Sequence, residues 1–118
     1  MPSNIINLEI VLDRVQNDTA LLLELLHDFE KDFQKKRKVI AQAFARQEFE
    51  KMQETVHSLK GAAGNLAADP IHNSLMIVEN LIKYRDMEMI REVLCDIDQQ
   101  FVELQAFIVE FKKKRERK

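Results

Sequence analysis

The residue most suited to carry out chemistry in this sequence is His57. It lies in a segment whose apolar residues have the spacing of a helix. Lys60, Gly61 and Gly64 follow it at intervals that bring residues together on a helix surface. The apolar residues of the segment define the direction of the core, and His57 points about 130° away from it. We therefore expect an exposed imidazole with a lysine and two glycines on the same strip.

The two glycines are informative because the chain has no others, and both fall inside this one helix. Each costs about 1 kcal/mol there relative to alanine. Gly61 is turned away from the core, so its missing methyl group predicts a bare surface that lets another protein approach closely. Gly64 lies nearer to the neighbouring helices, where close helix packing explains a glycine equally well. Gln53, one turn before His57, borders the same surface.

An exposed histidine is chemically suited to accept a phosphoryl group. The unperturbed pKa of a histidine side chain is about 6.5, so the imidazole is largely neutral and nucleophilic near pH 7. Phosphoryl transfer depends mainly on positioning and on compensation of charge. Lys60, one turn away from His57, could offset phosphate charge as a point cation.

The elements that must position these residues are all predicted to be helices. Glycine and proline occur only twice each, which favours long helices over a sheet. The apolar spacing predicts helices over residues 8–15, from a cap at Asn17 or Asp18 to about residue 45, over 48–68, from a cap at Asp69, and from about residue 86 to the end. The predicted core of the 48–68 helix consists of Phe49, Met52, Val56, Leu59, Ala63 and Leu66. That of the last helix consists of Ile90, Leu94, Ile97, Phe101, Leu104, Ile108 and Phe111.

We expect residues 1–118 to form one all-α domain, an antiparallel up-and-down four-helix bundle with a short extra N-terminal helix. Cys95 is predicted to pack as a small apolar side chain and Tyr84 to cover the bundle, whereas His27 and His72 are predicted to be surface residues.

The composition, net charge and cysteine count limit the class of protein and the compartment that we expect. The net charge is −2, and the composition, 46% hydrophobic and 32% charged, is that of a soluble domain. No apolar run could span a membrane, and no signal peptide is evident. The single cysteine cannot form an internal disulfide, so we expect a cytoplasmic protein. The basic runs at 35–38 and about 112–118 are interpreted as solvated helix ends rather than as nucleic-acid or membrane contacts.

The segment HSLKGAAGNL, residues 57–66, resembles the signature of histidine phosphotransfer (HPt) domains, in which a histidine is followed by x-Leu-Lys-Gly and a helix rich in small residues. The preceding LDRVQNDTALLLELLHDF and the later VENL are similar to the wider pattern, so the resemblance covers roughly residues 8–110. Two departures concern local helix ends. Ala67 stands where many members have glycine, and ARQEFE lacks a common Gly-Asp turn.

The resemblance implies a phosphorelay intermediate. His57 would be phosphorylated on its outer ring nitrogen, Lys60 would lie beside the phosphate, and Gly61 would leave room for a docking receiver domain. Phosphate would pass to and from aspartates in the receiver domains of hybrid sensor kinases and response regulators. The receiver would supply Mg²⁺, so the chain would need no metal or other cofactor of its own. We expect a monomeric carrier without kinase activity, and the charged C-terminal end favours a free-standing protein.

Two alternatives remain open. The first is an HPt-like adaptor that binds receiver or kinase domains without phosphate chemistry, although His57, Lys60 and Gly61 are all intact. The second is a di-iron carboxylate bundle, because two Glu-x-x-His pairs occur on two helices and further glutamates are available. The residues concerned are Glu24, His27, Glu54, His57, Glu79 and Glu103. All four residues of the pairs lie off their apolar stripes, which opposes an inward-facing metal site.

Overall fold

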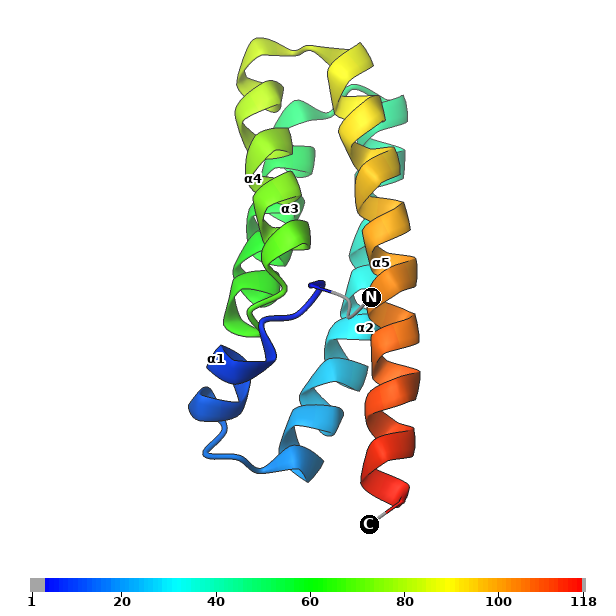
Figure 1. Cartoon of the computed structure of the whole chain (residues 1–118). Helices are drawn as coiled ribbons and strands as arrows, with labels where there is room; N and C mark the ends of the chain where they lie inside the picture. Colours follow the sequence, from blue (N-terminus) through cyan, green and yellow to red (C-terminus); the bar gives the residue numbers. More distant parts are fainter. Residues whose placement is uncertain (1–3, 118) are drawn as a thin grey trace.

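The computed structural model describes residues 4–117 and is built from five helices, with no strand among those residues (Figure 1). A short helix is followed by four long ones that alternate in direction, and the bundle measures 49 × 25 × 20 Å. The helices are α1 (Leu8–Arg14), α2 (Thr19–Ala45), α3 (Phe49–Asn65), α4 (Asp69–Tyr84) and α5 (Met87–Glu116). The predicted antiparallel four-helix bundle with a short N-terminal helix is confirmed.

Three of the helices begin where a side chain satisfies a free backbone N–H group. Asn7 Oδ1 accepts a hydrogen bond from the N–H of Ile10, and Asp18 Oδ1 accepts one from the N–H of Leu21. Asp86 Oδ1 does the same for the first turn of α5. These caps compensate donors that have no partner within the helix. Of the two predicted caps for α2, Asp18 is the one that forms.

The connection between α3 and α4 differs from the prediction at both of its ends. Helix α3 ends at Asn65 rather than at residue 68, and Ala67 has a left-handed φ of 54°. Its N–H donates to the carbonyl of Gly64 at 3.0 Å, which ties off the helix end. Glycine adopts the left-handed conformation freely. This is a physical reason why many members of the family that the sequence resembles have glycine where this chain has Ala67.

The predicted cap at Asp69 is wrong. Ala68 is the cap residue, with no side-chain hydrogen bond, and Asp69 is the first residue of α4. Pro70 therefore still lies in the first turn, where a missing N–H group has no cost.

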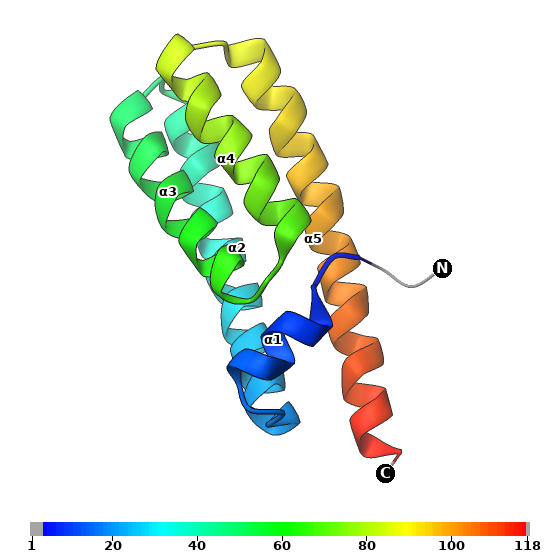
Figure 2. The same ribbon diagram turned by 60° about the vertical axis from the view of Figure 1, so that its left-hand side comes forward.

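Figure 2 shows the four long helices side by side. The core forms between them, where the predicted apolar stripes meet. The stripe of α3 is buried apart from the half-buried Phe49, and that of α5 is buried apart from the half-buried Phe111. Phe33 of α2 stacks on Phe101 of α5, with ring centroids 4.0 Å apart. Two packing predictions are wrong. Cys95 is exposed, and Tyr84, at the end of α4, is 77% exposed. Both lie beside an apolar stripe but on its solvent side.

Helix α1 forms hydrogen bonds with the C-terminal end of α3. The Arg14 guanidinium donates to the carbonyl of Gly64 at 2.8 Å and to that of Asn65 at 3.0 Å. The N–H of Asn7 donates to the carbonyl of Ala67 at 2.8 Å. Carbonyls at a helix C-terminus lack partners within the helix, and the cationic side chain also complements the negative end of the helix dipole. The α3–α4 connection is thus held from the N-terminal segment.

The basic C-terminal run forms the last turns of α5, and Arg115 Nε donates to Thr19 Oγ1 at 3.0 Å. Cations at this end complement the helix dipole, as predicted for a solvated helix end. The same prediction is wrong for residues 35–38, which lie within α2, where Arg37 pairs with Asp98 of α5 at 2.8 Å. None of the helices formed by residues 4–117 combines the length and hydropathy needed to cross a bilayer.

Candidate functional site

Helix α3 buries one face and exposes the strip that carries His57. Met52, Val56, Leu59 and Ala63 are fully buried and fix the rotation of the helix. This rotation leaves the His57 side chain 70% exposed, as the spacing of the apolar residues predicts. An imidazole with this exposure can meet a partner protein without any movement of the bundle.

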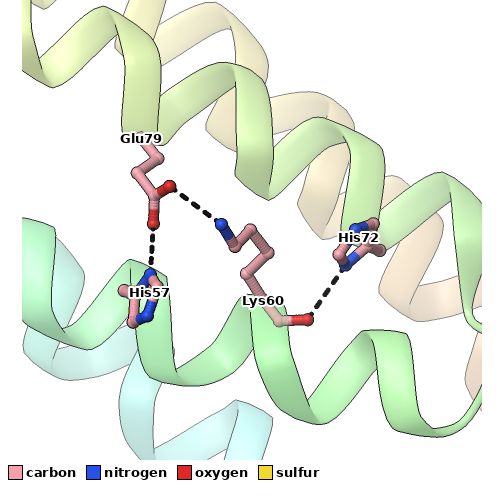
Figure 3. Close-up of polar contacts among 4 residues, drawn as sticks. All are labelled: His57, Lys60, His72 and Glu79. Carbon is pink, nitrogen blue, oxygen red and sulfur yellow. Dashed lines mark hydrogen bonds and ion pairs between the residues drawn. The ribbon is translucent and has the colours of Figure 1, made fainter.

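The structure places a carboxylate of α4 between His57 and Lys60 (Figure 3). Glu79 Oε2 lies 2.8 Å from His57 Nδ1, and Glu79 Oε1 lies 2.8 Å from Lys60 Nζ. The side chains of Lys60 and Glu79 are only 19% and 18% exposed, whereas the imidazole remains open to solvent. The three residues therefore form one hydrogen-bonded group with a buried side and an exposed side.

The ionisation of Glu79 decides which nitrogen of His57 carries a proton. The hydrogen bond from Lys60 is the largest influence on the Glu79 pKa and lowers it below its ordinary value of 4.5. Burial opposes this shift, and the hydrogen bond from His57 adds to it. An ionised carboxylate can only accept, so His57 Nδ1 must donate. In the neutral imidazole, Nε2 then has a free lone pair, and it lies on the far side of the ring from Glu79 (Figure 3).

The two glycines have different surroundings. A Cβ added at Gly61 would meet nothing within 4 Å, so this turn of α3 is open, as predicted. A Cβ added at Gly64 would lie 3.1 Å from Nδ1 of His72, a half-buried residue of α4. Gly64 therefore leaves room for a side chain of this protein. His27 and His72 were both predicted to be surface residues, and both are half-buried, with 43% of the His27 side chain exposed.

Gln53 lies one turn before His57 on α3 and is half-buried. Within residues 4–117 its Oε1 is shielded from solvent and has no hydrogen-bond partner. Its predicted place at the edge of a partner-binding surface, like that of Gly64, stays a prediction.

Polar side chains also flank His57 on the side of α2. Lys36 Nζ donates to Ser58 Oγ at 2.8 Å and to Asp32 Oδ2 at 3.0 Å. A shallow groove beside these residues runs between α2 and α3 and is lined by Leu25, Asp28, Phe29, Asp32, Ala62, Asn65 and Leu66. This side of α3 thus combines apolar and charged groups from two helices.

The residues considered for a di-iron site do not come together as one group in the structure. Glu24, Glu54 and Glu103 are exposed, and His27 pairs with Glu30 at 3.5 Å. Within the described part of the chain, no three His, Cys, Asp or Glu side chains come together as a group that could hold a metal ion. Glu79 instead binds His57 and Lys60 by hydrogen bonds.

Glu79 and His72 are the site residues that the sequence analysis missed, since it treated the first only as a possible metal ligand. A signal was available in the length of the α3–α4 hairpin. The chain turns at residues 66–68, so residues ten to twelve positions after the turn lie beside those ten positions before it. This places Glu79 opposite His57, but only once the antiparallel pairing of α3 and α4 is known.

Comparisons with known proteins agree with the helical-bundle fold. The sequence model of a family described as "Hpt domain" matches residues 24–110. Among solved structures, the chain is similar to the HPT domain from the Hpt sensor hybrid histidine kinase from Shewanella, with a TM-score of 0.76. That similarity covers 93% of this chain and 95% of the other at 15% sequence identity, so it supports the fold alone. No curated protein sequence matches this chain.

Proposed function

Because this chain belongs to the Hpt domain family, we propose that His57 is the residue on which it carries a phosphoryl group. The family gives the chain a role in histidine phosphotransfer within a phosphorelay, with two-component signalling proteins such as receiver domains as partners. The assignment to His57 rests on one observation, that the ring is held on one side and open to solvent on the other. Glu79 holds Nδ1 at 2.8 Å, while the side chain is 70% exposed.

The transfer step follows from this arrangement. The Nε2 lone pair attacks the phosphorus of a phosphoaspartate on the partner. The phosphorus–oxygen bond breaks as the phosphorus–Nε2 bond forms, and the aspartate leaves as a carboxylate. The imidazole becomes cationic while Nδ1 keeps its proton, and the anionic Glu79 stabilises that charge. The reverse step returns the phosphoryl group to a second aspartate and restores the neutral ring.

Lys60 and Gly61 have distinct supporting roles in this scheme. Lys60 Nζ is bound to Glu79 at 2.8 Å, so its charge lies one turn from His57, on the Nδ1 side of the ring. It offsets negative charge that accumulates during the transfer. Gly61 presents bare backbone on the exposed strip, which lets the partner bring its aspartate within reach of Nε2. Gln53 and Gly64 border this docking surface.

The wider setting follows from the same proposal. Residues 1–118 act as one domain, a monomeric cytoplasmic carrier that has no kinase activity of its own. Its partners are receiver domains of hybrid sensor kinases and of response regulators. The chain brings no cofactor, and the Mg²⁺ for transfer comes with the receiver domain.

The direct test is transfer of labelled phosphate from a panel of phosphorylated receiver domains to the wild-type protein and to His57→Gln. The substitution lies on the exposed strip, so the circular dichroism spectrum should not change. An acid-labile, base-stable label on the wild type alone would support the proposal. Binding of receivers by the folded wild type without any label would contradict it and favour the adaptor alternative.

A further inference from the structure

His72 of α4 belongs to the same face as Glu79, seven residues earlier and so about two turns away along the helix. Both side chains point toward α3 (Figure 3). Glu79 binds the two side chains of the proposed site, whereas His72 binds the backbone of the helix that carries them. His72 is therefore placed to act on the site through the packing of α4 against α3.

The contact of His72 with α3 is a directed hydrogen bond. His72 Nδ1 lies 3.1 Å from the carbonyl oxygen of Lys60. A carbonyl oxygen can only accept, so Nδ1 of His72 carries the proton and donates it. Lys60 is consequently held at both ends by α4, through its carbonyl by His72 and through Nζ by Glu79.

Gly64 makes this contact possible. A Cβ at this position would lie 3.1 Å from His72 Nδ1 and 3.4 Å from Cε1, closer than an undisturbed ring allows. The ring thus occupies the place where a residue 64 side chain would begin. The cost of a glycine inside a helix is offset here by a close contact, because any Cβ at position 64 would require the His72 ring to shift by a few tenths of an ångström.

We propose that His72 is a positioning residue, and that with Gly64 it fixes the register of α4 on α3 so that Glu79 meets His57 Nδ1. A slip of α4 by one residue would move Glu79 by about 1.5 Å along the helix axis. That displacement is enough to break a hydrogen bond of 2.8 Å. This inference rests on the proposed function, because the tautomer of His57 matters only if Nε2 is the nucleophile.

The test compares His72→Ala with His72→Asn, whose amide nitrogen can replace the donor at Nδ1. The first readout is the ¹⁵N NMR spectrum of the His57 ring, which reports how much of the tautomer with the proton on Nδ1 is present. The second is the rate at which phosphoramidate phosphorylates His57. In that reaction the phosphorus–nitrogen bond of the donor breaks, a bond to Nε2 forms, and ammonia leaves.

We expect His72→Ala to lower the fraction of this tautomer and to slow phosphorylation about fivefold, as for the loss of one ordinary hydrogen bond. His72→Asn should restore both readouts. An unchanged His57 spectrum and rate in folded His72→Ala would show a purely structural role and overturn the proposal. If His72→Ala does not fold, Gly64→Ala serves instead, because its Cβ would lie 3.1 Å from His72 Nδ1 and press the ring away from its present place. In that variant unchanged readouts would also overturn the proposal.

The two proposals fail in different ways. If His57 is not the carrier, wild-type protein takes no phosphate on this residue, yet the effect of His72 on the His57 tautomer is still measurable. If only the positioning role is wrong, wild type and His72→Ala are phosphorylated on His57 at the same rate.

Discussion

The two glycines of α3 lie within one turn of each other, and they meet opposite surroundings. Gly61 faces open space, whereas the ring of His72 packs against Gly64. The same division runs through the imidazole of His57, whose Nδ1 is bound by α4 and whose Nε2 edge is open. In the proposed function, two residues of one type therefore serve two purposes, room for a partner at Gly61 and room for α4 at Gly64.

The difference shows how a small bundle can hold the proposed nucleophile, the His57 ring, in place and still leave it accessible. The buried side of the strip is held by hydrogen bonds from α4, and the outer side is left bare. A substitution at Gly61 should consequently affect partners, whereas one at Gly64 should affect the protein itself. The predictions that follow test this division, from the largest expected effect to the smallest.

The largest effect is expected for Gly61→Gln, which places a long side chain on the open turn. Transfer from a phosphorylated receiver domain should fall about 100-fold, because a displaced reactant loses its in-line geometry. Phosphorylation by the small donor phosphoramidate should stay close to wild type. Ala106→Gln, which adds the same side chain at an exposed position of α5, is the matched control. Equal losses with both donors would argue against the steric role of Gly61.

A smaller effect is expected for Lys60→Ala, which removes the cation held beside His57. Both donors should react about tenfold more slowly, since the change removes charge compensation rather than space. Rates of labelling with a receiver and with phosphoramidate measure this. Lys51→Ala removes an exposed lysine of the same helix and should have no effect. A loss confined to the receiver would instead make Lys60 a docking residue.

The glycines themselves should differ in the free energy of unfolding when each is replaced by alanine. Gly61→Ala should stabilise the protein by about 1 kcal/mol, because the added methyl group meets no atom and the helix gains propensity. Gly64→Ala should lose that gain, since displacing His72 costs about one hydrogen bond. Urea denaturation measures both values. Equal stabilisation would mean that His72 moves aside without cost, and the comparison would fail.

The smallest effect concerns the contribution of Glu79 to stability at acid pH. Its pKa is below 4.5 in the folded protein, mainly because of the hydrogen bond from Lys60, so folding favours the ionised form. The resulting stabilisation is present above pH 4.5 and is lost as the pH falls through the folded-state pKa. Urea denaturation between pH 3 and pH 7 should show Glu79→Gln approaching the wild type at the acid end, within the range set by these pKa values. A difference that is constant across this range would exclude the ion pair as its source.

Much of the fold was predictable from the sequence because each helix buries one stripe. The spacing of Met52, Val56 and Leu59 determines which face of α3 is buried, and that determines the exposure of His57. The same information places Lys60 and Gly61 beside it. Local patterns of this kind do not depend on which helices become neighbours.

What could not be predicted depends on contacts between helices. Glu79 and His72 are distant from His57 in the sequence, and their roles depend on the axial register of α4. The purpose of Gly64 was equally hidden, because the ring that packs against it belongs to another helix. The end of α3 and the start of α4 were misplaced for a related reason, since Ala67 adopts a left-handed conformation that favours glycine.

The central claim is that α4 holds Nδ1 of His57 and leaves Nε2 as the nucleophile. The most direct measurement is NMR of the ¹⁵N-labelled protein after phosphorylation with phosphoramidate, which locates the phosphoryl group on one ring nitrogen of one histidine. The account predicts a single phosphohistidine, at Nε2 of His57. Phosphate on Nδ1 of His57, or on His27 or His72, would contradict it.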